Sequence, residues 1–347
     1  MESVALDPRD RGGKVQPLLI ARSLKKYFPM GRSLLGKRSY LHAVDDVSFS
    51  IGKRETLGVV GESGCGKSTL ARVLLDLMRR DAGELIFDGE AVGTFDGISR
   101  SEFRKSAQMV FQDSYASLNP RLTLEETLTF GPVYHGVKSA EAVTRANDLL
   151  HMVGLEPRRY AAAYPHELSG GQRQRVNIAR ALSLDPRLVV MDEPVSALDK
   201  SVEAQVLNLL IELRQRMSLT YVFISHDLNV VRFLSDRVMV MYLGKIVEIG
   251  PVDAVFNRPK HPYTLGLLAS LLSTNPDKRI DSAPLSGDPP SPINPPLGCR
   301  FASRCAFTEG ICHVRTPVLT QQASDEGHST ACHMVDIGSG HSKAAQA

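Results

Sequence analysis

The chain has 347 residues and a formal net charge of +3, and 43% of its residues are hydrophobic. This length predicts one large α/β domain with a smaller module, and the near balance of charge gives no general reason to expect a nucleic-acid partner. No apolar run approaches the roughly 20 residues that cross a bilayer, and residues 1–15 lack the apolar centre of a secretory signal. We therefore expect a soluble or peripheral protein. The five cysteines fit a reducing compartment, by default the bacterial cytoplasm.

The first part of the chain predicts a flexible N-terminus, residues 1–16, followed by short strands. Residues 17–24 are rich in apolar side chains, and residues 43–51 alternate apolar and polar side chains, which suits an antiparallel strand with one solvated face. Residues 83–88 lead into the pair Asp88-Gly89, which is typical of a hairpin. We therefore expect an antiparallel β subdomain beside an α/β core.

A glycine-rich stretch between these strands fits the phosphate-loop pattern G-x-x-x-x-G-K-[ST]; it reads Gly61-Glu62-Ser63-Gly64-Cys65-Gly66-Lys67-Ser68-Thr69. The apolar run 56–60 before it suits a buried strand, and residues 70–78 have helical spacing. Glycines let successive N–H groups turn toward an anion, and the helix adds its positive end. Lys67 would reach the β- and γ-phosphates of ATP, and Ser68 would coordinate Mg²⁺. The alternative is a glycine-rich turn that fits by chance.

Beyond residue 107 the pattern predicts a mostly parallel sheet with helices between its strands. A helical insertion of about residues 113–165 interrupts this core, and residues 260–272 predict its last helix. The whole ATPase domain would span residues 17–272. The apolar runs that we expect to be strands lie at 107–111, 188–191, 221–224 and 238–242.

Two acids, Asp192 and Glu193, follow the apolar run 188–191 at the end where α/β sheets bind their ligands. Asp192 would hold Mg²⁺, and Glu193 would orient or deprotonate an attacking water. The alternative is a pair of ordinary strand-end acids.

A second glycine-rich helix start reads Leu168-Ser169-Gly170-Gly171-Gln172. Ser169 can cap the helix that begins near Gln172, and the two glycines leave its N-terminus bare. Such a start could grip another face of a phosphate. A plain helix cap is the alternative.

These motifs, in this order, resemble the ATP-binding subunits of ABC transporters over roughly residues 17–272. The resemblance implies that Tyr27 stacks on the adenine ring, that Gln112 senses the γ-phosphate and Mg²⁺, and that His226 helps to position the attacking water. It also implies that Ser169, Gly170 and Gly171 touch ATP bound to a partner cassette. Asp199, in the run Ser196-Ala197-Leu198-Asp199, would lie at the seam between the two cassettes.

More narrowly, Gly58–Thr69 and three further stretches look like the oligopeptide and dipeptide importers. The three further stretches are Met109–Asp113, Ala116–Arg121, and His261-Pro262-Tyr263-Thr264 with the later Gly298-Cys299-Arg300-Phe301. Cys65 and Lys26-Tyr27-Phe28-Pro29 make the chain more similar to the second of the paired ATPases. Ser114 and Val195 depart from the usual residues of the family, and neither removes a catalytic group.

The C-terminal part predicts a proline-rich connector, residues 273–297, a cysteine module, residues 298–334, and a disordered tail, residues 335–347. Four thiolates gathered in a loop-rich module would suit a [4Fe–4S] cluster, and related importer ATPases are thought to carry one. Zinc and free reduced cysteines remain alternatives. The four are Cys299, Cys305, Cys312 and Cys332.

We therefore expect an ATPase that powers uptake of di- or oligopeptides, with ATP and Mg²⁺ as its ligands. By the resemblance, its partners would be a sister ABC ATPase subunit, two transmembrane permease subunits and an extracytoplasmic substrate-binding protein. It would lie peripherally on the cytoplasmic face of the cell membrane. Import of nickel, glutathione or another small solute is an alternative, as is a soluble ATPase that acts on ribosomes or DNA.

Overall fold

The computed structural model describes residues 9–10, 13, 15–32, 38–270, 287–321 and 327–344. By its contacts the chain divides into two compact units. The first comprises Met1–Ile20, Ser50–Thr56 and Leu85–Ser225, and the second comprises Ala21–Phe49, Leu57–Glu84 and His226–Ala347. None of the helices in the described ranges is both long and apolar enough to cross a membrane.

The first unit is built on three parallel strands in the order β8-β7-β6. Every residue of β7 (Leu188–Asp192) and β8 (Thr220–Ile224) is buried, which explains their continuous apolar sequence. The edge strand β6 (Ala107–Val110) follows α2 (Arg100–Ser106), and the long helix α7 (Lys200–Met217) leads into β8.

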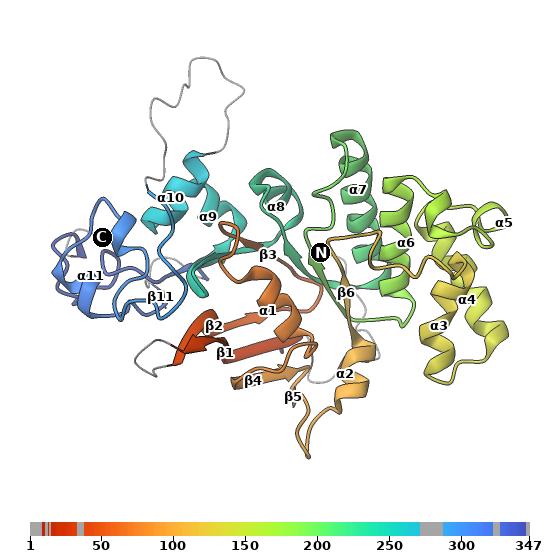
Figure 1. Cartoon of the computed structure of the whole chain (residues 1–347), viewed down its shortest axis with the longest axis horizontal. Helices are drawn as coiled ribbons and strands as arrows, with labels where there is room; N and C mark the ends of the chain where they lie inside the picture. The colour runs from red at the N-terminus through yellow and green to blue at the C-terminus, as the bar shows by residue number, and fades with distance from the viewer. Residues whose placement is uncertain are drawn as a thin grey trace. The chain divides into compact units, whose positions relative to one another are not determined.

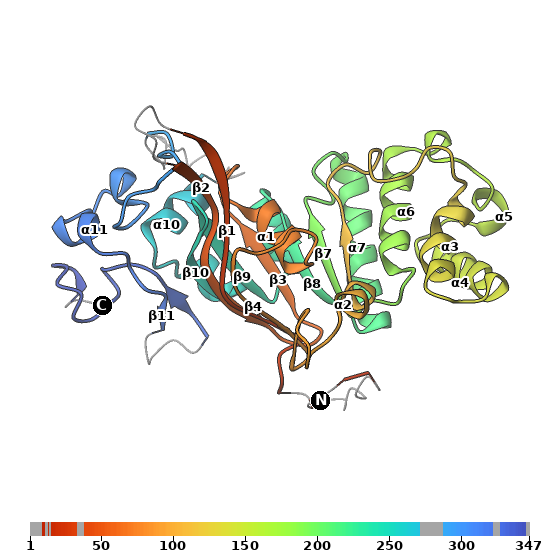
Figure 2. The same ribbon diagram turned by 60° about the horizontal axis from the view of Figure 1, so that its bottom comes forward.

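The predicted helical insertion is present and belongs to the first unit. It contains α3 (Leu124–Tyr134), α4 (Ser139–Met152), α5 (Pro157–Tyr160) and the 3₁₀ helix η1 (Pro165–Glu167). Figures 1 and 2 show α3, α4 and α5 as a group beside α6 (Gly170–Leu182). Thr123 caps α3 in a box with Glu126, so the insertion begins at a local start signal.

In the second unit, strands follow the order β11-β12-β10-β9-β3. Strand β3 (Thr56–Val60) pairs in parallel with β9 (Arg237–Tyr242), and β9 pairs antiparallel with β10 (Lys245–Pro251). Helix α1 (Lys67–Leu74) follows β3, and α8 (Leu228–Leu234), α9 (Val252–Asn257) and α10 (Pro262–Ala269) complete the ATPase part.

The predicted antiparallel subdomain is present. Strands β1 (Leu19–Arg32) and β2 (Arg38–Ile51) are 14 residues each, and the order is β2-β1-β4, with β4 at Ala82–Phe87. The end of β4 pairs with β5 (Glu90–Ala91). Both long strands extend beyond the predicted ranges, because a pleated strand can carry polar side chains on its solvated face. Residues 33–37, between β1 and β2, lie outside the described residues.

The cysteine module is not a separate appendage in this structure. It contains η2 (Ala302–Arg304), α11 (Gly310–Val314), β11 (Thr320–Gln321) and β12 (Ser329–Thr330). Strand β12 pairs with β10, so this module extends the sheet of the ATPase domain. The connector between them lies partly outside the described residues, because residues 271–286 are not described.

Buried polar contacts stabilise the junction between the ATPase domain and the cysteine module. Glu248 on β10 is 0% exposed, and its carboxylate accepts hydrogen bonds from the backbone N–H groups of Lys260 and His261. The ring of His328 lies 2.7 Å from the same carboxylate. A buried carboxylate with three partners costs far less than an isolated one, which makes this junction specific.

Residues 335–347 were predicted to form a disordered tail, but the structure shows residues 335–344 folded. These residues form turns, and Val335, His341 and Ala344 are buried. The Nε2 atom of His341 lies 2.9 Å from the carbonyl oxygen of Phe307, so the module extends past Met334. Small polar residues thus fold here because a neighbouring surface supplies their partners.

Candidate functional site

The phosphate loop has the predicted order of strand, loop and helix. Strand β3 is buried throughout and ends at Val60, and α1 begins at Lys67. Gly66 has φ +109°, and a Cβ atom there would lie 2.0 Å from the carbonyl oxygen of Ala43. Only glycine fits this position without a shift of the backbone. The loop is therefore fixed by backbone geometry at the start of the helix.

Lys67 is 6% exposed, and the loop's own carbonyl groups hold it. Its Nζ atom donates to the carbonyl oxygen of Gly61 at 2.7 Å and to that of Glu62 at 3.0 Å. An ammonium group in this position can exchange these carbonyls for phosphate oxygens. Ser63 and Gly64 are exposed at the tip of the loop, and Ser68 and Thr69 are half-buried in the first turn of α1.

Cys65 points inward, with 3% exposure, and burial raises the pKa of its thiol. It therefore stays neutral at physiological pH and packs as a small apolar residue. Within the predicted loop, Cys65 contributes its backbone, whereas its side chain belongs to the core.

Residues of the C-terminal region hold Glu62 in place. The sequence did not predict this contact. The backbone N–H of Glu62 donates to the hydroxyl of Tyr263 at 2.8 Å. Its carboxylate accepts two hydrogen bonds from Arg304, at 2.8 and 3.0 Å. The stretch His261-Pro262-Tyr263-Thr264 was the only available signal, and it carried no indication of a contact with the loop.

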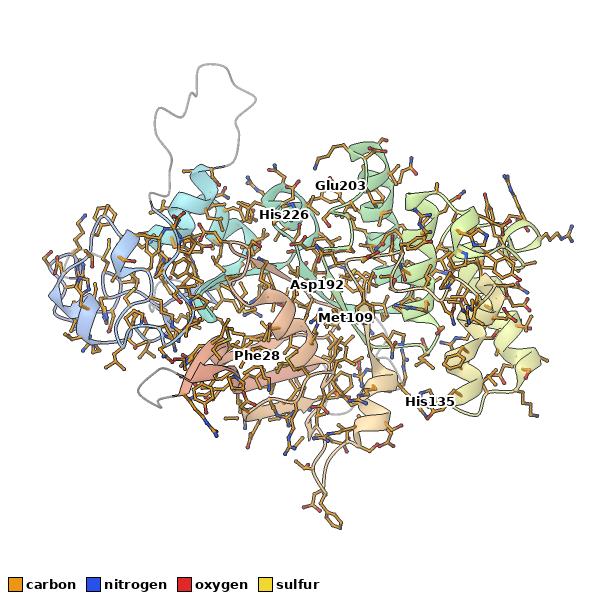
Figure 3. All side chains as sticks on the ribbon, in the orientation of Figure 1. Phe28, Met109, His135, Asp192, Glu203 and His226 are labelled. Atoms are coloured by element: carbon orange, nitrogen blue, oxygen red, sulfur yellow. The ribbon has the colours of Figure 1, made fainter. Side chains whose placement is uncertain are left out.

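In the first unit, Asp192 is the last residue of β7 and is 3% exposed; Figure 3 labels it together with Met109 on the neighbouring strand β6. Glu193 follows with φ +49°, and its N–H donates to the carbonyl oxygen of Ile224 at 2.9 Å. The amide Nε2 of Gln112 donates to the Glu193 carboxylate at 3.0 Å. The structure thus brings Gln112 and Glu193 together at the carboxyl ends of parallel strands.

Ser169 caps α6 as predicted, although the helix begins at Gly170, two residues earlier than expected. Its hydroxyl accepts the N–H of Gln172 at 3.3 Å, and its own N–H donates to the Gln172 side chain at 3.0 Å. A Cβ atom at Gly171 would lie 2.5 Å from Val202 of α7. Ser169 is exposed, so this helix start faces outward from its own unit.

The remaining predicted residues occupy different settings. Asp199 is the exposed N-cap residue of α7, and His226 is exposed between β8 and α8 (Figure 3). The hydroxyl of Tyr27 donates to Asp45, and its ring stacks on His42 with centroids 4.1 Å apart. Burial, followed by the contact with Asp45, raises the pKa of Tyr27. One face of the ring predicted to bind adenine is therefore covered by His42.

The predicted iron–sulfur site is not supported. Within the described residues, which include all five cysteines, no group of three or more His, Cys, Asp or Glu side chains is placed to hold a metal ion. Burial raises the pKa of Cys299 to about 11 and that of Cys332 to about 12, and it also raises the pKa of Cys305. Neighbouring cysteines add to this effect on Cys299 and Cys332, and the described residues give no support to the predicted cluster.

A polar cavity of about 890 Å³ lies elsewhere in the first unit, at the amino ends of β6 and β7. Its lining mixes cations and acids, and Arg187 there pairs with Asp88 at 2.8 Å. It lies at the opposite ends of these strands from Asp192 and holds none of the predicted motifs.

Two families of known proteins match the sequence. The ABC transporter family matches residues 44–196, and the oligopeptide/dipeptide transporter C-terminal region matches residues 247–312. The first range contains the phosphate loop, Gln112, Ser169 and Glu193. The second contains Tyr263 and Arg304.

Two similar proteins align over most of the chain. The oligopeptide transport ATP-binding protein AppF of Bacillus subtilis (strain 168) is 46% identical over 324 residues, covering 92% of this chain and 98% of that protein. The dipeptide transport ATP-binding protein DppF of Escherichia coli (strain K12) is 46% identical over 325 residues, covering 92% and 95%.

Solved structures share the fold. The structure of cbiO1 from Clostridium perfringens, part of the ABC transporter complex cbiONQ, has a TM-score of 0.60 and 26% identity, and covers 72% of this chain and 95% of that one. The ATP-binding cassette MJ0796, a dimer in a post-hydrolysis state with ADP and Pi, has a TM-score of 0.57 and 28% identity, with coverage of 67% and 98%.

Proposed function

Because the chain aligns over nearly the whole length of relatives that are 46% identical to it, it belongs to the oligopeptide/dipeptide transporter family of ABC ATP-binding proteins, and we propose that it powers the import of peptides across the cytoplasmic membrane. Proteins of this family hydrolyse ATP. The relatives named for oligopeptide and dipeptide transport support peptides as the cargo.

The phosphate loop is the feature that supports ATP binding most strongly. Its glycines leave the N-terminus of α1 open, and buried Lys67 lies beside it. The N–H groups and the positive helix end would hold the phosphates of ATP, and Lys67 would move from the carbonyls of Gly61 and Glu62 to the β- and γ-phosphates.

Mg²⁺ prefers hard oxygen donors, and three of the predicted residues offer them. These are the hydroxyl of Ser68, the carboxylate of Asp192 and the amide oxygen of Gln112. The nearly complete burial of Asp192 at a strand end suits a carboxylate that a cation neutralises. When bound, the ion would offset the charge on the β- and γ-phosphates.

Glu193 would orient and deprotonate the attacking water, with Gln112 holding its carboxylate in place. Two hydrogen-bonded side chains at the ends of adjacent strands form a geometry suited to general base catalysis. His226 would help to position the same water, and Tyr27 would stack on the adenine ring.

The exposed start of α6 supports a second cassette as partner. Ser169, Gly170 and Gly171 would contact ATP held by that partner, and Asp199 would lie at the seam. We propose a sister chain as the partner cassette. ATP binding would draw the two cassettes together, and hydrolysis would release them.

The helical insertion would carry this movement to two permease subunits, at the cytoplasmic face of the membrane, and a separate binding protein would deliver the cargo. Phe130 and Tyr134 on α3 support such a contact, since they are 68% and 78% exposed and their rings stack 6.5 Å apart. Exposed aromatic pairs of this kind are typical of protein interfaces.

Replacing Glu193 with Gln tests the hydrolytic step. We expect Glu193→Gln to lower ATP hydrolysis by about 100-fold or more, because the base is lost while the shape of the side chain is kept. Binding of ATP should be unchanged. Full turnover by this variant would disprove the assigned role.

The cargo is tested by co-purifying the membrane subunits and measuring hydrolysis in proteoliposomes. Stimulation by a binding protein loaded with di- or oligopeptide is the expected result. Stimulation by nickel or glutathione instead would replace peptide as the cargo, and sedimentation with ribosomes would contradict a transporter role.

A further inference from the structure

The phosphate loop contains a carboxylate of its own, and a residue 242 positions away neutralises it. The Nη1 and Nη2 atoms of Arg304 donate to the two carboxylate oxygens of Glu62, at 2.8 and 3.0 Å. This two-pronged contact is the strongest geometry that an arginine and a carboxylate can form. Glu62 raises the pKa of Arg304, so the guanidinium stays charged.

The position of Arg304 is fixed from the other side as well. Its side chain is 5% exposed and lies over the rings of Tyr242 and Phe301, with 5.9 Å from the guanidinium carbon to each centroid. The Nη1 atom also lies 3.4 Å from the hydroxyl of Tyr242. An arginine stacked on two aromatic rings loses little entropy when it binds its carboxylate.

Glu62 in turn contacts the lysine of the loop. Its carbonyl oxygen accepts a hydrogen bond from Lys67 at 3.0 Å, and its N–H donates to Tyr263 at 2.8 Å. The backbone of Glu62 is therefore held by Tyr263, its side chain by Arg304, and its carbonyl by the residue that would grip the phosphates.

A free carboxylate in the phosphate loop would repel a nucleotide that carries several negative charges. Glu62 is one residue from the exposed tip of the loop, and its side chain is 24% exposed, so solvent screens its charge only in part. Pairing with Arg304 removes this repulsion and holds the loop backbone in one arrangement before ATP arrives.

A second arginine of the same module supports the idea of a link. Arg300 donates to the carboxylate of Asp45, which also accepts the hydroxyl of Tyr27, the residue predicted to contact adenine. Arg300 and Arg304 are four residues apart and thus connect the cysteine module to two separate parts of the predicted nucleotide site.

We propose that Arg304 is a positioning residue for ATP, which acts through Glu62 by neutralising the carboxylate of the phosphate loop and holding the loop ready for the phosphates. The C-terminal module is then part of the nucleotide site. This inference rests on the proposed binding of ATP at the loop.

Two substitutions and their combination test it in the full-length chain, with a fluorescent non-hydrolysable ATP analogue and Mg²⁺ as the probe. Arg304→Gln should raise the Kd for the analogue by about five- to tenfold, because Glu62 is left unpaired. Glu62→Gln alone should leave the Kd within about twofold or lower it. The double variant should return to the wild-type value, since a neutral side chain at residue 62 needs no cation.

Further measurements test whether the effect of Arg304→Gln comes from the lost charge. The effect of Arg304→Gln should shrink as salt rises and should be smaller for the corresponding AMP derivative, which carries fewer charges. In hydrolysis assays, KM for ATP should rise while kcat stays nearly unchanged, because the loss is in binding. Arg304→Lys, which keeps the charge without the fork, should lie between wild type and Arg304→Gln.

Arg315→Gln is the matched control, because this arginine belongs to the same module, is 48% exposed and pairs with Asp336 at 3.5 Å. It should bind like wild type. Equal loss of affinity in Arg304→Gln and in the double variant would overturn the proposal, because it would show a structural role alone. If Arg304→Gln does not fold, an unchanged Kd in Arg304→Lys would overturn it. A wild-type chain that bound no nucleotide would instead overturn the proposed function.

Discussion

The helices α1 and α6 both start at glycine-rich turns that were predicted to bind phosphate, yet their N-termini are stabilised in different ways. At α1, no side chain in the described part of the chain caps the helix, and its N-cap residue Gly66 is left-handed. At α6, Ser169 and Gln172 satisfy two N–H groups reciprocally. An uncapped start leaves its N–H groups for a ligand, whereas a capped one is stable without it.

The residues around the two helix starts differ as well. The loop before α1 contains buried Lys67 and is held through Glu62 by Tyr263 and Arg304. Ser169 at α6 is exposed. The first start is held in one arrangement by residues of its own chain, whereas the second is an exposed surface, as the proposed contact with a partner cassette requires.

The largest expected effect comes from removing the charge of the α1 site. Lys67→Ala should weaken ATP binding by about 100-fold or more and abolish hydrolysis, since the phosphates lose their buried cation. Fluorescence titration with an ATP analogue measures it. The exposed Lys138 provides the control, and Lys138→Ala should bind like wild type. Wild-type affinity in Lys67→Ala would mean that the loop is not the nucleotide site.

The second prediction concerns the backbone of the loop. Gly66→Ala should lower the free energy of unfolding by about 2–4 kcal/mol, because its Cβ atom would meet the carbonyl oxygen of Ala43 at 2.0 Å. Gly64 also has a positive φ, of +76°, but open space around it, so Gly64→Ala should cost only about 1 kcal/mol. Chemical denaturation of both variants makes the comparison. Equal losses of unfolding free energy would show that backbone strain, rather than the contact with Ala43, determines the cost.

The part of this site that could be predicted is the part whose signals are contiguous. The phosphate loop, the cap of Ser169 and the acids after β7 are each specified by neighbouring residues, and the structure has the predicted strands and helices around them. Arg304 was missed because its partner Glu62 is 242 residues away, and no local pattern specifies a contact between distant segments.

The C-terminal module was least predictable for the same reason. Strand β12 has only two residues, and it exists because β10 offers an edge for pairing. Four cysteines in a loop-rich module, together with the family resemblance, suggested a cluster, whereas the described residues contain no group of three or more His, Cys, Asp or Glu side chains placed to hold a metal ion. The order of cysteines along the chain does not determine whether their side chains are placed to hold a metal ion.

A buried histidine next to the tyrosine that holds the phosphate loop should make the free energy of unfolding depend on pH. His261 is 1% exposed, and burial lowers its pKa from 6.5 to about 4. Below pH 6.5 the unfolded chain binds a proton that the folded chain refuses, so stability is lost as pH falls toward 4. The loss from this residue should reach about 3 kcal/mol.

His261→Asn isolates that contribution. Nδ1 of His261 accepts the N–H of Tyr263 at 3.0 Å, and an asparagine oxygen can take over this role at the start of α10. The difference in unfolding free energy between wild type and variant should therefore narrow as pH falls from 6.5 to 4. Parallel pH curves for the two proteins would show that His261 titrates normally.

The smallest effect on the isolated chain is expected at the α6 start, where Ser169→Ala removes one capping hydrogen bond and should cost about 1 kcal/mol. Thr123 is a matched control, because it caps α3 in the same way, with its hydroxyl 3.2 Å from the N–H of Glu126. Thr123→Ala should cost the same amount, and neither variant should change ATP binding by the isolated chain.

The two capping variants should differ in activity only in the assembled transporter. If Ser169 also contacts ATP on a partner cassette, Ser169→Ala should lower hydrolysis by about tenfold there, because a hydrogen bond to a charged phosphate is lost. Thr123→Ala should leave that rate unchanged. Since both variants lose equal stability, a difference in rate cannot come from folding. Equal rates in the two would reduce Ser169 to a helix cap and remove the contrast between a site complete in one chain and a surface completed by another.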